Sequence, residues 1–139
     1  MRQAQHDLIV RTNGQDLYEI TGAVVSWLRD QNIEQGLLTL FCRHTSASLT
    51  IQENADPDVR ADLLAFFRRT VAEDPSLYAH DMEGPDDMPA HIRSALTDVS
   101  IGIPVSDGRL VLGTWQGIYL FEHRQGPQRR QVVLHLSGL

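Results

Sequence analysis

The sequence predicts an α+β protein in which largely antiparallel or mixed β-sheet layers pack with two to three helices. Strand-like alternation occupies both ends of the chain, most of the helical periodicity falls between them, and no regular strand–helix–strand order favours a parallel sheet. The 139 residues are about the size of one domain, and no linker, repeat or low-complexity segment divides them. We therefore expect a single domain over residues 1–139.

The first third of the chain is predicted to contain two strands, a helix and a long strand. The string "HDLIVRTNGQDLYEI" has strand-like residues on both sides of Asn13-Gly14, which favours a hairpin turn. "TGAVVSWLRDQ" has apolar residues at helical spacing after Thr21, which can cap the first turn. From Gly36 the period is two, predicting a strand that runs into a small-residue bend at 45–48. The two faces of this strand carry Leu38, Leu40, Cys42 and His44, and Leu37, Thr39, Phe41 and Arg43.

The middle of the chain is predicted to be mostly helical. Asp56 is a suitable N-cap, and Pro57 suits the first helical position. The expected buried stripe of this helix is Val59, Leu63, Phe66, Phe67 and Val71. Residues 74–88 show no periodicity and are expected to form a loop, after which Pro89 opens a second helix. The inward residues of that helix are expected to be Ile92, Ala95, Leu96 and Val99.

The last third is predicted to be strands. Residues 100–124 are expected to form a strand, a turn at Asp107-Gly108 and a second long strand, and residues 128–138 a final strand. Gly113 and Gly117 fall in the second of these strands, where glycine indicates a bulge or a close approach of backbone.

Composition excludes several classes of function. The net charge of −6 and the absence of a basic stripe argue against nucleic acid as a partner. No apolar run is long enough to cross a bilayer, and "MRQAQHDLIV" lacks the apolar core of a signal peptide. The single Cys42 excludes an internal disulfide framework and fits a reducing compartment. We therefore expect a cytoplasmic protein without a membrane partner.

Three segments carry unusual chemistry. "HDMEGPDDMPAH" (80–91) is a long loop bracketed by His80 and His91, which converge only if the loop folds back on itself; polar surface or capping histidines are the simpler interpretation. "RHTSAS" (43–48) has hydroxyls and backbone amides suited to a phosphate or carboxylate, or it is a polar turn. A Ser–His nucleophile in it has no GxSxG motif to support it.

The third segment is "LGTWQGIYLFEHR" (112–124), which ends in Glu122, His123 and Arg124. Alternation sets Gln116, Glu122 and Arg124 on one face and Trp115, Tyr119 and His123 on the other. A surface ion pair between Glu122 and Arg124 is the ordinary alternative. If the three segments meet, they supply the groups needed to bind a divalent metal and a phosphorylated small molecule.

The sequence resembles the YjbQ-like family, whose members include proteins described as secondary thiamine-phosphate synthases. The matching strings are "HTSASLTIQENADPDV", "HDMEGPDDMPAHI", "GRLVLGTWQGIYLFEHR" and "RRQVVLHLSG", which together cover most of the chain. The resemblance implies an α+β homotrimer with a histidine-lined site that can hold a metal. It also implies a weak ability to join a pyrimidine pyrophosphate to a thiazole phosphate, with an unsettled physiological role. Asp81 stands where many relatives have Asn, which puts in doubt any role there that needs a neutral amide.

The residues at the family's motif positions are His44, His80, Asp81, His91, Glu122, His123 and Arg124. We expect His80 and His91 to bind a divalent metal with either His44 or His123 as a further ligand. Neutral imidazoles favour zinc, and magnesium is the alternative with a pyrophosphate substrate.

The remaining roles concern the substrate. Arg124, with the amides and hydroxyls around Thr45 and Ser46, is expected to hold the phosphate and to stabilise the charge that builds as pyrophosphate leaves. Asp81 or Glu122 is the expected general base.

Two other functions use the same residues. A metal-dependent phosphoester hydrolase would activate water at the metal and needs no second substrate. A non-enzymatic phosphometabolite-binding protein would bind its ligand without turnover.

Overall fold

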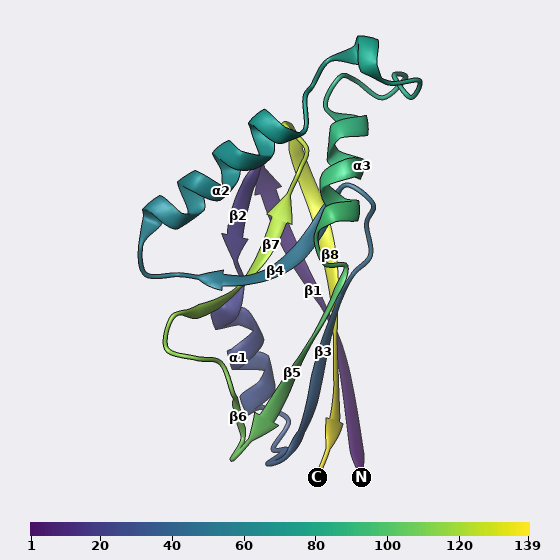
Figure 1. Cartoon of the computed structure of the whole chain (residues 1–139). Coiled ribbons are helices and arrows are strands. Elements are labelled where there is room, and N and C mark those ends of the chain that lie inside the picture. Colours follow the sequence, from purple (N-terminus) through teal and green to yellow (C-terminus); the bar gives the residue numbers. More distant parts are fainter.

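Two antiparallel sheets form the fold, which the computed structural model describes over residues 1–139 (Figure 1). The larger sheet, in the order β1-β8-β3-β5-β6, contains β1 (Arg2–Asn13), β3 (Gly36–Cys42), β5 (Ser100–Ser106), β6 (Arg109–Leu110) and β8 (Pro127–Gly138). The smaller sheet, in the order β2-β7-β4, contains β2 (Asp16–Glu19), β4 (Ala47–Glu53) and β7 (Gln116–Glu122). The helices are α1 (Thr21–Arg29), α2 (Pro57–Thr70), the short 3₁₀ helix η1 (Pro75–Leu77) and α3 (Asp87–Leu96). The predicted α+β class is confirmed.

The main core lies between the two sheets and α1. The larger sheet contributes alternate residues of β3, β5 and β8, as their period-two patterns predict. The smaller sheet and α1 supply the facing side. The fully buried members include Leu38, Leu40, Leu134 and Leu136 from the larger sheet, Leu49, Ile118 and Leu120 from the smaller, and Val24 from α1. On β3 the other face stays open, with Leu37 and Phe41 about half exposed.

Helix α2 covers the outer face of the smaller sheet (Figure 1). Asp56 caps it by accepting a hydrogen bond from the amide of Asp58, and Pro57 is its first residue, both as predicted. The expected buried stripe is only partly confirmed. No residue of α2 is fully buried and Phe66 is 47% exposed, because the helix rests on a three-stranded sheet with no further layer above it.

The chain crosses from the larger sheet to the smaller one at three places, between β1 and β2, between β3 and β4, and between β6 and β7. The sequence pattern predicts a hairpin, a bend or an unbroken strand at these places. The predicted hairpin at Asn13-Gly14 is wrong, because β1 pairs with β8 and β2 pairs with β7. The Tyr18 hydroxyl accepts from the Asn13 amide at 2.8 Å and donates to the Gly14 carbonyl at 2.9 Å. These two bonds satisfy backbone groups of the turn although β1 and β2 do not pair with each other. The bend after β3 likewise leads into β4, and β6 ends early so that β7 joins the smaller sheet.

Two details of α1 and the β5–β6 turn bear on the sequence predictions. Ile20 holds the N-cap position of α1. The Thr21 hydroxyl accepts from the Ile118 amide at 2.8 Å, so its predicted capping role is wrong. The turn at Asp107-Gly108 is confirmed, with φ of 53° and 73° at its two central residues, the left-handed conformation of a tight hairpin.

Helix α3 begins at Asp87, two residues before the predicted start, and it faces the protein differently from the prediction. Its buried residues are Asp87, Pro89, Ala90 and Arg93. Leu96 is 62% exposed and Val99 45% exposed, so the predicted inward face is wrong. Polar groups can occupy the inner face because they are paired there: Arg93 donates to the Val71 carbonyl at 3.1 Å.

The chain termini and helix α3 lie at opposite ends of the molecule. The termini lie together at one end, where β1 and β8 pair, and α3 with the loop that precedes it lies at the other (Figure 1). None of the helices has the length and apolar character required to cross a bilayer. His91 lies in α3 and His80 in the loop before it, so both are at the α3 end of the molecule.

Candidate functional site

The loop before α3 folds back so that its first histidine meets the start of the helix. Gly84 adopts a φ of 98°, a left-handed conformation that reverses the chain within the loop. Asp86 then occupies the N-cap of α3, and Asp87 is the first helical residue. Because residues four apart share one face of a helix, Asp87 and His91 project together. This local geometry brings His80, Asp87 and His91 to one point.

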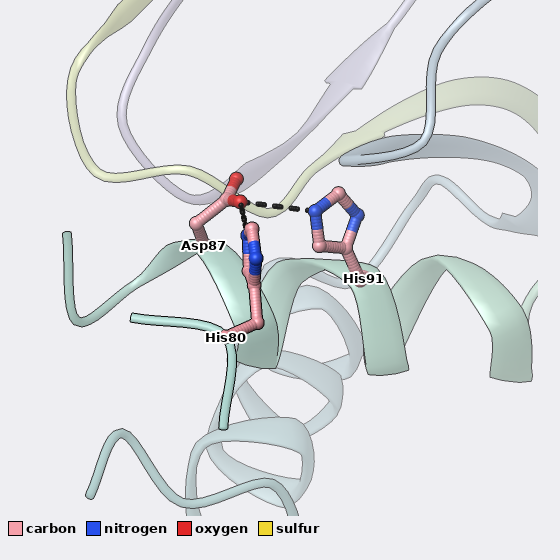
Figure 2. Close-up of side chains that lie close together, drawn as sticks. All are labelled: His80, Asp87 and His91. Atoms are coloured by element: carbon pink, nitrogen blue, oxygen red, sulfur yellow. Dashed lines mark hydrogen bonds and ion pairs between the residues drawn. The ribbon is translucent and has the colours of Figure 1, made fainter. Parts of the chain in front are cut away.

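The three side chains share a single carboxylate oxygen, as Figure 2 shows. His80 Nε2 lies 2.7 Å from Asp87 Oδ2, and His91 Nε2 lies 3.0 Å from the same atom. One ligand-type atom from each residue lies within 4.8 Å of the others. Asp87 is buried, whereas the side chains of His80 and His91 are 42% and 31% exposed. We call these three residues the His–Asp–His cluster.

Arg124 fixes the orientation of the central carboxylate. Its Nη1 donates to Asp87 Oδ1 at 2.8 Å, leaving Oδ2 for the histidines. Its Nε donates to Asp86 Oδ2 at 2.9 Å, and Nη2 donates to the Glu83 carbonyl at 3.0 Å. Burial raises the pKa of Asp87, but the hydrogen bond from His80 and the charges of His91 and Arg124 outweigh burial and hold that pKa below its usual value. Asp87 is therefore an anion at neutral pH.

The backbone fixes which nitrogen of His91 faces the cluster. His91 Nδ1 lies 2.9 Å from the Thr45 carbonyl oxygen, which can only accept, so Nδ1 carries a proton. In the neutral ring, Nε2 then has a lone pair directed at Asp87 Oδ2. A lone pair and a carboxylate oxygen at 3.0 Å repel unless a proton or a cation lies between them. A metal-binding histidine commonly donates its second N–H to a backbone carbonyl in this way.

The donor set fits a divalent metal ion of the zinc type. Two imidazole nitrogens and one carboxylate are a common catalytic zinc set, which leaves a fourth position for water or substrate. The exposure of both histidines gives that position access to solvent. The all-oxygen, octahedral preference of Mg²⁺ fits less well.

His44 and His123, the two candidates for a third histidine ligand, are not part of the cluster. His44 Nε2 accepts from the Gln131 amide at 2.8 Å, which places the proton of the neutral ring on Nδ1 and leaves no free lone pair. Burial and the charge of Arg130 lower the pKa of His44. Asp87, and neither of these histidines, is the third group of the cluster.

His123, which directly follows β7, is fully buried. Its Nε2 lies 2.8 Å from Ser48 Oγ, and its ring packs against Phe121. Burial, with the charges of Arg93 and Arg130, lowers the pKa of His123 to about 3, so the ring is neutral at physiological pH. His123 is therefore a packing residue of the protein interior and does not meet solvent.

Glu122 is also fully buried, which excludes it as a general base that meets substrate. Its carboxylate accepts from Arg130 Nε at 2.7 Å, from the Thr12 hydroxyl at 2.6 Å and from the amides of His123 and Arg124. The proposed surface ion pair of Glu122 with Arg124 is wrong, because Arg130 is the partner of Glu122 and Arg124 turns to the acids of the α3 loop.

The predicted phosphate-binding residues Thr45, Ser46 and Arg124 do not form one site. Ser46 is buried, and its hydroxyl accepts from Arg130 Nη2 at 3.0 Å. Arg124 is engaged with the two aspartates. Thr45 is exposed and lies in a hollow of about 420 Å³ that also contains His44 and His91. Asp81 is exposed and lies in a second hollow of about 290 Å³ that contains His80. The cluster thus has an open hollow on each side.

Asp87 is the residue that sequence reasoning missed. A helix that begins at Pro89 places Asp87 in the loop, whereas the helix begins at Asp87 and so sets Asp87 and His91 four residues apart on one helical face. An Asp four residues before a His, at a position where a helix can begin with the first Asp of an Asp-Asp pair as its N-cap, is the signal that identifies it.

The fold and the site define a class: a small two-sheet α+β protein with a preformed His–Asp–His cluster at one end. Residues 6–139 match the family described as "UPF0047 protein YjbQ-like", and the chain belongs to this family. A UPF0047 protein of Synechocystis is 53% identical over 137 residues, which cover 99% of this chain and 93% of the relative. The YjbQ protein of Escherichia coli is 43% identical over 135 residues, covering 96% and 97%.

Solved structures agree with this assignment. A hypothetical protein of Aeropyrum pernix superposes with a TM-score of 0.89 at 30% identity, covering 98% of this chain and 99% of that one. A protein of Clostridium acetobutylicum described as an uncharacterized YjbQ/UPF0047 family member gives 0.83 at 35% identity, covering 96% and 99%.

Proposed function

We propose that this protein is a divalent-metal enzyme that acts on phosphorylated small molecules. The observation that carries the proposal is the convergence of His80 and His91 on one oxygen of the buried Asp87, with both rings open to solvent. Arg124 orients the carboxylate of Asp87, and the Thr45 carbonyl orients the ring of His91. Outer contacts that orient metal ligands in this way are common at metal sites, which supports a role in binding a cation.

Zinc is the proposed ion. When bound by His80, Asp87 and His91, it would supply a Lewis acid with one open position for an oxygen of substrate or water. Asp81 is the candidate general base, because it is exposed in the hollow beside His80 whereas Glu122 is inaccessible. Arg124 acts on the metal-binding carboxylate and not on the substrate.

The proposed reaction is the one that the family resemblance implies, in which a pyrimidine pyrophosphate condenses with a thiazole phosphate. A bond forms from the thiazole nitrogen to the methylene carbon of the pyrimidine, and the bond from that carbon to the pyrophosphate oxygen breaks. Both substrates are anions, and the hollows on either side of the cluster, of about 420 and 290 Å³, offer room for two small molecules.

Phosphoester hydrolysis is the second candidate. It is favoured by one observation: three protein ligands leave a position at which water can be activated. Release of phosphate from a monoester, with no second substrate present, would distinguish it from condensation. Tight binding without either turnover would indicate a phosphometabolite-binding protein.

We also infer assembly into a homotrimer in the cytoplasm. The outer face of the larger sheet has no covering layer, and Leu37 stands about half exposed on it. Burial against another copy would remove this apolar surface from water. The one thiol, Cys42, is buried and forms no disulfide, as in most proteins of a reducing compartment.

Metal analysis tests the proposed site. We expect untagged wild type to retain about one zinc per chain, as one three-ligand site requires. His91→Ala and Asp87→Ala should lose it, whereas His135→Ala, which removes a histidine on β8 outside the cluster, should keep it. Circular dichroism should show the same fold in all four proteins. Unchanged metal content in His91→Ala would rule out the assignment.

A further inference from the structure

The hollow beside His91 has a second hollow next to it. The first contains His44, Thr45, Thr97 and Val99 and has a volume of about 420 Å³. The second, of about 400 Å³, shares His44, Thr45 and Val99 and adds Phe41 and Arg43. The two hollows are neighbours, with His44, Thr45 and Val99 lining both, and together they extend from His91 of the cluster to Phe41 near the end of β3. We call the two hollows together the β3 groove.

The groove has a hydrogen-bond donor whose state is set by the backbone. The Gln131 amide donates to His44 Nε2 at 2.8 Å, so the neutral His44 ring carries its proton on Nδ1. Burial is the main cause that lowers the pKa of His44, and the charges of Arg130 and Arg43 lower it further. His44 is therefore a neutral N–H donor at physiological pH, not a metal ligand.

The groove also has a cation that no acid neutralises. Arg124 and Arg130 are each paired with carboxylates inside the protein. Arg43, in contrast, is exposed, forms no side-chain hydrogen bond or ion pair, and lies where its charge acts on His44. A free guanidinium that lines the same hollow as an imidazole N–H donor and the hydroxyl of Thr45 is suited to an anion with several oxygens.

We propose that Arg43, His44 and Thr45 form a phosphate subsite, and that the β3 groove binds a phosphorylated aromatic small molecule with its ring along Phe41 and Val99. The two apolar side chains are half exposed and offer the groove's hydrophobic wall. The inference deepens the proposed function, because the groove ends at His91, but phosphate binding at this subsite requires no metal. It replaces Arg124 and Ser46 as phosphate ligands with Arg43 and His44.

Binding to metal-free protein tests the subsite separately from the metal. After removal of metal with a chelator, phenyl phosphate, inorganic phosphate and benzyl alcohol are titrated by calorimetry into wild type and variants. Arg43→Gln should weaken phenyl phosphate binding by roughly 10-fold or more, the usual effect of losing a charge-assisted contact. Thr45→Val, which keeps the shape and the backbone carbonyl, should weaken it by about 5-fold.

Controls separate a specific site from general attraction. Arg109→Gln makes the same charge change on exposed β6, far from the cluster (Figure 1), and should bind like wild type. Phenyl phosphate should bind more tightly than inorganic phosphate, and benzyl alcohol should bind weakest. Equal losses in Arg43→Gln and Arg109→Gln would overturn the phosphate subsite, and equal affinity for phenyl and inorganic phosphate would overturn the aromatic specificity. Failure here with metal still retained in the holoprotein would leave the metal site standing.

Discussion

Asp86 and Asp87 are adjacent in sequence and yet serve different partners. Asp87 faces the two histidines, whereas Asp86 accepts from Arg124 Nε at 2.9 Å and from the Gln125 amide at 3.0 Å. Asp86 thereby joins the loop before α3 to the end of β7. This contact holds Arg124 in the position from which it orients Asp87.

Replacement of Asp86 by Asn should destabilise the protein in a pH-dependent manner. Burial raises the pKa of Asp86, but the hydrogen bonds from Arg124 and Gln125 outweigh burial and leave that pKa below its ordinary value. A carboxyl with a lowered folded-state pKa contributes stability above its unfolded pKa and loses it as pH falls through the folded one. We expect Asp86→Asn to lose about 1–3 kcal/mol of unfolding free energy at pH 7.

Urea unfolding at several pH values checks this prediction. The difference between wild type and Asp86→Asn should shrink as pH falls below about 4, the ordinary range of aspartate. A difference that stays constant down to pH 3 would mean that the charge of Asp86 contributes nothing.

Glu122 and Arg130 form a buried ion pair that should matter for folding more than for chemistry. Removing one partner of such a pair leaves an uncompensated charge and typically costs about 3–5 kcal/mol. We expect Glu122→Gln to lower the unfolding free energy by roughly this amount. The folded fraction should still retain metal, since Glu122 is no part of the cluster. Loss of metal from Glu122→Gln protein that is fully folded by circular dichroism would contradict this view.

At the scale of elements, two glycines should respond oppositely to alanine. A Cβ at Gly22 in α1 would meet nothing within 4 Å, whereas a Cβ at Gly36 would collide with the backbone carbonyl of Ser137 on β8. Gly22→Ala should stabilise the protein by up to about 1 kcal/mol through helix propensity. Gly36→Ala should destabilise it by about 1–3 kcal/mol because the β3–β8 ladder must shift.

Thermal unfolding of both glycine variants is the measurement, and a decrease in midpoint for Gly22→Ala together with no change for Gly36→Ala would refute the prediction.

Helix α3 shows, at the same scale, that hydropathy alone does not predict which face of a helix is buried. Its apolar residues suggested an inward face of Leu96 and Val99, but its polar residues Asp87 and Arg93 are inside because partners from other elements satisfy them. A helix face is chosen by the whole set of contacts, not by hydropathy alone.

At the scale of the whole molecule, the open face of the larger sheet predicts how copies assemble. Leu37→Glu would place a charge on the apolar face of β3 and should convert the proposed trimer into monomers. Leu77→Glu is the matched control, because Leu77 is also exposed but lies on η1, away from that face. Sedimentation velocity of the three proteins decides the matter; a Leu37→Glu protein that sediments like wild-type trimer would exclude this face as the interface.

The sequence by itself determined the α+β class, the capped start of α2, the two faces of β3 and the turn between β5 and β6. These features depend on residues close together in the chain, through alternation, capping and backbone preference. The glycine and prolines of the loop between His80 and His91 showed only that its ends can meet, and the resemblance to the YjbQ-like family indicated the two histidines as a pair.

Only the tertiary structure decided the rest. The three crossings between sheets depend on which distant strand offers a partner, and a turn sequence such as Asn13-Gly14 is compatible with either outcome. The roles of Glu122, His123 and Arg124 depended on partners from 8 to 110 residues away, such as Arg130 and Thr12. Burial and pairing are properties of the folded chain, so the same residue types that suggested chemistry in the sequence are divided by the fold into a solvent-open cluster and a buried framework beneath it.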